Sequence, residues 1–256
     1  MTGTLAFLKK ELRETWSTHR LYVILAIFVL IGFTSPLLAK MAPDILGSMA
    51  KDSGLSIQIP PPTAVDAYSQ LFKNLNNLGT LAVIFSLIGL VVDEKMRGSA
   101  IMMITKPVPR WAFITSKYVV SAGLVLLSTA LSYAACLYYT LLIFHETHLA
   151  TSLAATLLAM IFYLLVLALT LLASTVGRSL ALSGGIAIAG VLLLSLLPQL
   201  NPWLAHYSPG ALIGYQAKLV EGSVVLADTL PAVGITLALT VVLVALSVLI
   251  FGRQEL

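Results

Sequence analysis

The sequence is poor in charge and almost without cysteine. Charged residues make up 10% of its 256 positions, against about 25% in an ordinary soluble domain, whereas 59% are hydrophobic. Apolar runs long enough to cross the ~30 Å hydrocarbon layer as helices recur along the chain, which predicts a polytopic membrane protein. The single cysteine, Cys136, excludes an intrachain disulfide and is expected to be a small buried hydrophobe.

No stretch is long enough for a separate soluble domain of ~100 residues, so residues 1–256 are expected to form one transmembrane domain. The fold class predicted is all-α, with six transmembrane helices at about 21–39, 75–92, 118–144, 153–176, 181–197 and 230–251. A preceding charged segment makes the first apolar run resemble a signal peptide. Its length and the lack of a small-residue cleavage site indicate a retained anchor instead.

Chemistry-bearing residues are missing from these spans, which contain no Asp, Glu, Lys, Arg or His. A transporter driven by protons or sodium normally carries an ionisable group at mid-membrane, and an intramembrane protease needs a base or metal ligands. The sequence His145-Glu146-Thr147-His148 lacks the H-E-x-x-H spacing of a zinc site. We therefore expect no catalytic, cofactor-binding or metal-binding residues.

A phosphate-binding loop is also missing, because no Gly-x-x-x-x-Gly-Lys motif occurs. Leu182-Ser183-Gly184-Gly185 copies part of an ATPase signature but lies near the start of an apolar span, so we interpret it as coincidence. Gly184, Gly185 and Gly190 are expected to allow close helix approach. Any nucleotide-driven work must come from another chain.

Basic residues are unevenly shared between the two sides of the predicted membrane. Eleven fall in the segments on the N-terminal side: Lys9, Lys10, Arg13, Arg20, Lys95, Arg97, Lys106, Arg110, Lys117, Arg178 and Arg253. Four fall on the other: Lys40, Lys51, Lys73 and Lys218. The positive-inside rule then places both termini in the cytoplasm of a multi-pass cell-membrane protein. The net charge of +4 is explained by this topology and by contact with anionic lipid, without nucleic acid.

The longest polar interruption on the cytoplasmic side is the segment 93–117 between spans two and three. Gly98 can end the preceding helix, Ser99–Thr105 is one or two turns long, and Pro107 stops it. The pattern predicts a short cationic helix on the membrane surface. Residues 4–16 form a second amphipathic helix, with Leu5, Leu8, Leu12 and Trp16 in one stripe and Lys10, Glu11, Arg13 and Glu14 on the remaining surface.

The 93–117 segment resembles the loop between the second and third spans of the membrane subunits of type-2 ABC exporters. The residues that match by type and spacing are Glu94, Gly98, Ser99, Ile104, Pro107, Arg110 and Lys117. The resemblance implies a permease whose 93–117 segment holds a coupling helix that docks on a separate ATPase, and whose N-terminal helix is an elbow helix. It also implies two ATPase subunits, which would bind the ATP and magnesium, and a second six-span permease, identical or homologous.

Two outer segments are longer than turns. In 40–74, Thr63 and Asp66 resemble a capping box opening a surface helix with Val65, Tyr68, Phe72 and Leu75 on one face. This segment is either a lid or a connector resting on lipid. The segment 198–229 is rich in proline, glycine and aromatics and fits the outer interface. The resemblance implies short helices there that dip into the membrane.

Hydroxyl residues of span three, Ser128, Ser132, Tyr133, Tyr138 and Tyr139, either line a path or serve helix packing. For the whole chain, the alternative to a permease is a non-transporting anchor or assembly factor that recruits a cytoplasmic partner. The uncharged spans favour an amphipathic or hydrophobic cargo, with a small hydrophilic solute as the alternative.

Overall fold

The computed structural model of this protein describes residues 2–52, 61–96 and 110–253, and this part of the chain consists of helices joined by short connections, without strands. Its elements, in chain order, are α1 (Thr2–Ser17), α2 (His19–Asp52), α3 (Ala64–Asn74), η1 (Leu75–Gly79), α4 (Thr80–Leu87), α5 (Gly89–Met96), α7 (Arg110–Phe144), α8 (Leu149–Val176), α9 (Leu180–Leu200), α10 (Pro202–Tyr207), α11 (Ala211–Val220), η2 (Leu226–Thr229) and α12 (Leu230–Arg253).

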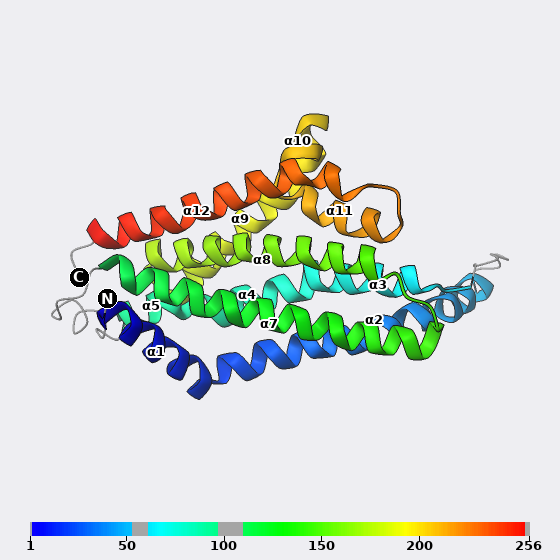
Figure 1. The fold of residues 1–256 in the computed structure, drawn as a ribbon, viewed down its shortest axis with the longest axis horizontal. Helices are drawn as coiled ribbons and strands as arrows, with labels where there is room; N and C mark the ends of the chain where they lie inside the picture. Colours follow the sequence, from blue (N-terminus) through cyan, green and yellow to red (C-terminus); the bar gives the residue numbers. More distant parts are fainter. Residues whose placement is uncertain (1, 53–60, 97–109, 254–256) are drawn as a thin grey trace.

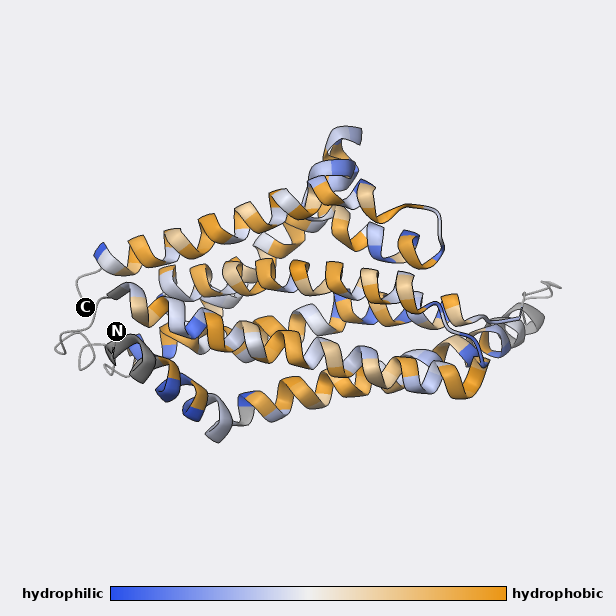
Figure 2. Ribbon diagram, viewed as in Figure 1, coloured by the Kyte–Doolittle hydropathy of each residue, from blue (hydrophilic) through white to orange (hydrophobic). Residues whose placement is uncertain are grey.

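Within the described ranges, six helical segments are long and apolar enough to cross a membrane, in agreement with the predicted number: Arg20–Ile45, Ala64–Met96, Trp111–Phe144, Leu149–Val176, Leu180–Leu200 and Leu226–Arg253. They run roughly along one axis, and α1 lies at the same end of the bundle as the C-terminal end of α12 (Figure 1). Hydrophobic residues cover the middle of these helices, and hydrophilic residues gather toward their ends and on α1 (Figure 2).

The core of the bundle forms around α8, which packs against α4, α5, α7, α9, α11 and α12. Phe162 and Tyr163 of α8 are fully enclosed, together with Phe28 of α2 and Tyr68 and Phe72 of α3. Cys136 is buried, as predicted. The hydroxyls of Ser128 and Ser132 are also buried, which favours a packing role over the lining of a path.

The predicted outer loop 40–74 is wrong in extent. Helix α2 continues through Pro36 and Pro43 to Asp52, and α3 begins at Ala64. Polar residues after Ala39 therefore end the apolar segment without ending the helix. The capping box is confirmed, since the Thr63 N–H donates to the Asp66 carboxylate at 2.8 Å. The predicted apolar face of α3 is buried inside the bundle rather than resting on its surface.

Span two contains a π-helical turn, η1, that joins α3 to α4 without a break. The fully buried Tyr163 hydroxyl donates to the backbone oxygen of Leu75 at 2.7 Å, which satisfies a carbonyl in the widened turn. A Cβ on Gly79 would collide with that hydroxyl. One residue into the turn, the Asn76 amide donates to the Gln216 side chain of α11 at 2.8 Å.

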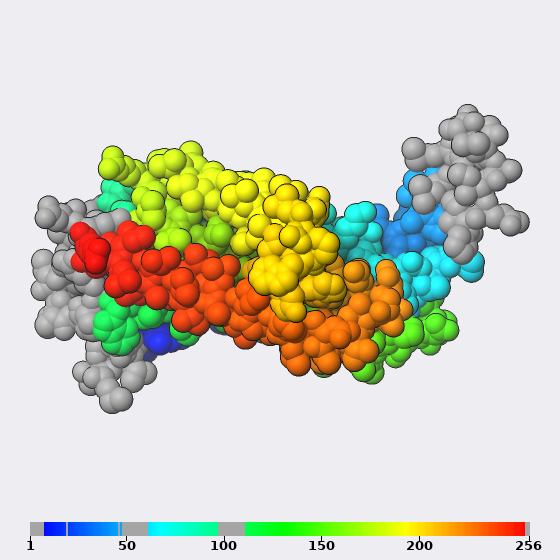
Figure 3. All heavy atoms as spheres, turned by 90° about the horizontal axis from the view of Figure 1, so that it is seen from above, coloured from blue at the N-terminus to red at the C-terminus, as the bar shows by residue number. Residues whose placement is uncertain are grey.

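The segment 198–229 contains α10, α11 and η2, so it is helical in short pieces. Helix α10 lies across the surface formed by α9 and α12 (Figure 3). The expectation about the three glycines of α9 is correct at one position. A Cβ on Gly190 would press against Leu169 of α8, whereas one on Gly184 or Gly185 would have no atom within 4 Å.

The expected boundary of span three is also wrong, because α7 begins at Arg110 and not at Tyr118. Residues 110–117, with Arg110 and Lys117 at their two ends, are part of this helix and not of the loop. Lys117 consequently stands on a transmembrane helix and is enclosed by protein. The prediction of charge-free spans holds only for the shorter limits on which it was based.

Candidate functional site

The two ends of the 93–117 segment converge at the end of the bundle that carries α1. Glu94 is on the last turns of α5, and Lys117 is two turns into α7. Their side chains meet, with Lys117 Nζ 2.8 Å from Glu94 Oε1. Gly98, Ser99, Ile104, Pro107 and the predicted coupling helix lie outside the described residues. Arg110 is the first residue of α7.

Lys117 also binds the N-terminal helix. Its Nζ lies 3.2 Å from a carboxylate oxygen of Glu11 on α1. The three side chains are largely closed to solvent, with exposed fractions of 2% for Lys117, 5% for Glu11 and 12% for Glu94. The ammonium group lies 4.9 Å from the ring centre of Phe113, one turn back on α7. One buried cation therefore holds α1, α5 and α7 together.

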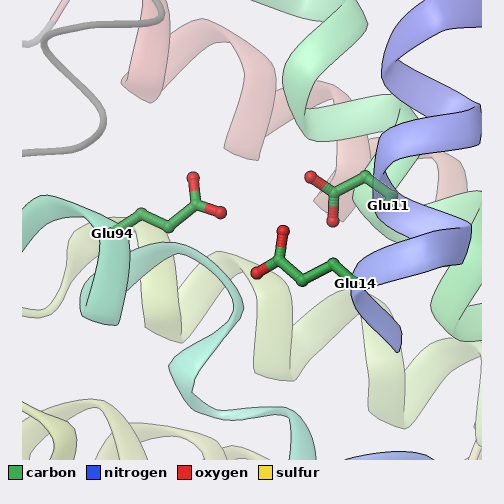
Figure 4. Close-up of side chains that lie close together, drawn as sticks. All are labelled: Glu11, Glu14 and Glu94. Atoms are coloured by element: carbon green, nitrogen blue, oxygen red, sulfur yellow. The ribbon is translucent and has the colours of Figure 1, made fainter. Parts of the chain in front are cut away.

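Two further residues of α1 complete what we call the terminal charge cluster: Lys10, Glu11, Glu14, Glu94 and Lys117. Lys10 Nζ lies 3.0 Å from Glu14, 3.3 Å from Glu11 and 3.4 Å from Glu94. Lys10 and Glu14 are four residues apart and so share one face of α1. The carboxylates of Glu11, Glu14 and Glu94 point toward one another across the space between α1 and α5 (Figure 4).

These carboxylates resemble the ligand set of a metal ion, because they offer oxygen atoms within 4.8 Å of one another. The ammonium groups of Lys10 and Lys117 already lie among them at hydrogen-bonding distance. A metal ion would have to displace these two ammonium groups, whose charges neutralise most of the negative charge of the three carboxylates. The geometry is that of an ion-pair network between helices.

The pKa values at the exposed edge of the cluster agree with this assignment. Burial lowers the pKa of Lys10, but the carboxylates of Glu11, Glu94 and Glu14 more than offset this effect and raise the pKa above its ordinary value. For Glu14, burial acts to raise the pKa, yet its hydrogen bond to Lys10 and the charges of Lys10, Lys117 and Arg20 lower it overall. Both residues are held in their charged forms.

Around the cluster, neighbouring contacts fix the end of span two. Arg20 of α2 donates to Asp93 at 2.9 Å. Lys95 donates to the backbone oxygen of Thr175 at the end of α8, at 2.8 Å. The hydroxyl of Ser174 accepts from the backbone N–H groups of Val91 and Val92. The last turns of α5 are thus bonded to α1, α2, α7 and α8.

The N-terminal helix α1 packs on the bundle through its charged side, and its predicted apolar stripe faces outward. Its charged face, through Glu11, is buried, whereas Leu12 and Trp16 of the predicted apolar stripe are exposed and Leu8 is half-buried. The fourth member, Leu5, belongs to α1. The apolar stripe is therefore left for contact with lipid, because the polar partners of α1 are inside the protein.

The sequence pointed to Glu94 and Lys117, but it gave Glu11 and Lys10 only a place on the polar side of α1, with no partner. The i,i+4 pair of Lys10 and Glu14 was visible in the sequence. Nothing local indicated that Glu11 would meet a lysine 106 residues away.

No protein-family profile matches the chain. The chain is similar to a protein of Bacillus subtilis (strain 168) named uncharacterized transmembrane protein YxlG, with 27% identity over 210 residues. The alignment covers 80% of this chain and 81% of that relative. Together with the six apolar helices, this similarity shows a membrane protein with several candidate transmembrane helices.

Proposed function

We propose that the chain is the permease subunit of an ATP-driven exporter of the type-2 ABC class. In this proposal it pairs with a second six-span permease and with two separate ATPase subunits that bind ATP and magnesium. The observation that carries the proposal is the contact of Lys117 with both Glu94 and Glu11. This contact joins the two ends of the 93–117 segment and attaches them to the N-terminal helix.

The joined ends of α5 and α7 would let a push on the 93–117 segment reach the spans. A partner that pushes on residues between 96 and 110 acts on two helices whose bases are already joined. Since α5 continues through α4 and η1 into α3, displacement at its base is transmitted along the whole of span two. Helix α1, joined through Glu11, moves with the same unit and would bear on the membrane surface.

The distribution of charge along the spans favours an energy source outside this chain. The acidic and basic residues of the described spans lie toward the helix ends, such as Arg20, Asp93 and Lys117, and the middle of the bundle is filled by apolar side chains. A proton or sodium relay would need ionisable groups at mid-membrane. The packed interior of one chain also favours a path formed between two copies.

The test is to purify the chain from its native membrane under gentle solubilisation and to identify its partners. We expect an ABC ATPase in the complex. Its ATP hydrolysis should fall several-fold when Glu94→Gln and Arg110→Ala are combined. The matched control is Glu146→Gln, an exposed acid on the short loop at the other end of the bundle.

Recovery of intact complexes without an ATPase, or an activity equally unchanged in both variants, would contradict the permease assignment. Recovery of a cytoplasmic partner that does not bind nucleotide would instead support a membrane anchor.

A further inference from the structure

A lateral groove of about 700 Å³ lies among α2, α4, α5 and α9, toward the end of the bundle that carries α1. Its size is within the range of sites that enclose small molecules. Its lining includes Arg20 and Asp93, apolar side chains such as Val23 and Phe85, and the glycines Gly184 and Gly185. Most of these residues are apolar or lack a side chain, and the two charged ones stand together.

The wall formed by α9 leaves room for an alkyl chain. Gly184 and Gly185 have no side chains, and a Cβ on either would have no atom within 4 Å. The wall extends from Leu180 to Ile188, a rise of roughly 12 Å along the helix. On the other side, Val23, Phe85 and Ile88 supply apolar surface. Such a groove favours a hydrocarbon chain over water.

The charged end of the groove presents opposite charges side by side. Arg20 Nη2 lies 2.9 Å from Asp93 Oδ2, and the side chains retain exposed fractions of 33% and 22%. The guanidinium has five N–H donors and the carboxylate several lone pairs, so one mutual bond leaves both able to bind a ligand. Gly89 is needed for this arrangement, because a Cβ there would collide with the Asp93 carboxylate.

An adjacent cation and anion select against a headgroup that carries a single charge, because one of the two residues would repel it. A phosphate fits Arg20, and a primary ammonium can donate hydrogen bonds to Asp93. A trimethylammonium has no N–H to donate. We propose that the groove binds one phospholipid with a phosphoethanolamine headgroup, its phosphate on Arg20, its ammonium on Asp93 and an acyl chain along Gly184 and Gly185.

The expected depth of Arg20 and Asp93 in the membrane agrees with this assignment. Arg20 begins the first candidate span, and Asp93 is near the end of the second, so both stand where headgroups meet the hydrocarbon layer. The lipid would belong to the cytoplasmic leaflet if this end faces the cytoplasm, as the positive-inside rule predicts. Binding of the lipid needs no ATPase, so it is tested on this chain alone.

The experiment measures lipid retention by the purified chain in detergent, using native mass spectrometry with equal amounts of phosphatidylethanolamine, phosphatidylglycerol and phosphatidylcholine. We expect phosphatidylethanolamine to be preferred on the order of tenfold, the effect of one charge-assisted hydrogen bond. Asp93→Asn should abolish this preference over phosphatidylglycerol, since Arg20 would then favour an anionic lipid. Arg20→Gln should lower retention of all three lipids.

A second variant tests the chain-binding wall independently of the charges. Gly185→Leu places a side chain in the open groove and should lower phosphatidylethanolamine retention on the order of tenfold. Gly234→Leu is the matched control, because it also faces open space but lies on α12 outside the groove lining. Thermal unfolding in the same detergent shows whether each variant is folded.

Equal retention of the three lipids by the unmodified chain would overturn the proposal, as would a preference that persists in Asp93→Asn. A second copy in the groove would overturn it too. That outcome would be seen as disulfide-linked dimers of a Gly185→Cys, Cys136→Ala variant together with the absence of lipid exchange.

Discussion

At the scale of single residues, Lys117 stands out as a buried charge on a membrane-spanning helix. Its ammonium group is the buried cation between two carboxylates, from Glu11 and Glu94, in a place that water scarcely reaches. Removing one partner of a buried ion pair leaves an uncompensated charge, and this costs far more than the intact pair contributes.

We therefore expect Lys117→Met to lower the free energy of unfolding by about 3–5 kcal/mol. Equilibrium unfolding in mixed micelles would measure this change. The control is Lys9→Met, an exposed lysine of α1. Adding Glu11→Gln and Glu94→Gln to Lys117→Met should restore much of the lost stability, because no buried charge then remains. A loss as small as that of the control would show that the cluster is solvated.

At the scale of elements, the π-helical turn η1 depends on one hydrogen bond from α8. Tyr163→Phe removes the donor to the Leu75 carbonyl and should cost about 1–3 kcal/mol of stability. Gly79→Ala should be destabilising because the added Cβ collides with the Tyr163 hydroxyl.

The double variant provides the sharper test of this contact. Gly79→Ala should cost less when combined with Tyr163→Phe than when made alone, since the colliding oxygen is absent. Gly123→Ala on α7, where the new Cβ meets no atom within 4 Å, is the control. Strictly additive effects of the two substitutions in a double-mutant cycle would contradict the contact.

The attachment of α1 should depend on pH at both extremes. Lys10 has a raised pKa, so its contribution is complete below its ordinary value of 10.5 and is lost as the pH rises through the raised value. Glu14 has a lowered pKa, so its contribution is complete above 4.5 and is lost as the pH falls through the lowered value.

Fluorescence of Trp16 on α1, in a Trp111→Phe, Trp203→Phe background, would follow this attachment. We expect the Trp16 fluorescence to be constant between the ordinary pKa of Glu14 and that of Lys10, and to change at lower and higher pH. Glu14→Gln should reduce the acid-side change, whereas Thr15→Val, next to it on α1, should leave it unaltered. A signal that is flat through the acid range would show that Glu14 does not help to hold α1.

At the scale of the whole molecule, the arrangement of the ends is open to direct test. Helix α1 and the C-terminal end of α12 lie at the same end of the bundle (Figure 1), and Phe251 of α12 stacks on Phe113 of α7 with ring centres 5.0 Å apart. Basic residues are in excess at this end of the bundle. The positive-inside rule therefore predicts that this end faces the cytoplasm.

A membrane-impermeant maleimide should therefore label Glu146→Cys but not Lys9→Cys in intact cells, each in a Cys136→Ala background. Both positions are exposed to solvent, so the contrast reports sidedness rather than burial. Permeabilised cells provide the control, in which both should react. The reverse pattern in intact cells would invert the topology.

Sequence alone determined the class of this protein, because the hydropathy of a span depends only on its own residues. The six apolar segments, the capping box at Thr63 and the buried Cys136 all followed from local composition and spacing. Helix ends did not follow, since α2 and α7 continue into polar sequence that hydropathy assigns to loops. A polar residue ends the apolar part of a helix without breaking its backbone hydrogen bonds.

Only the tertiary structure decided what the charged residues do. Glu11, Glu94 and Lys117 are far apart in sequence, and their meeting depends on how α1, α5 and α7 pack. The pairing of Arg20 with Asp93 beside an open groove depends likewise on α2 and α5. A charge acquires a partner through distances between helices, which amphipathic patterns within one helix do not specify.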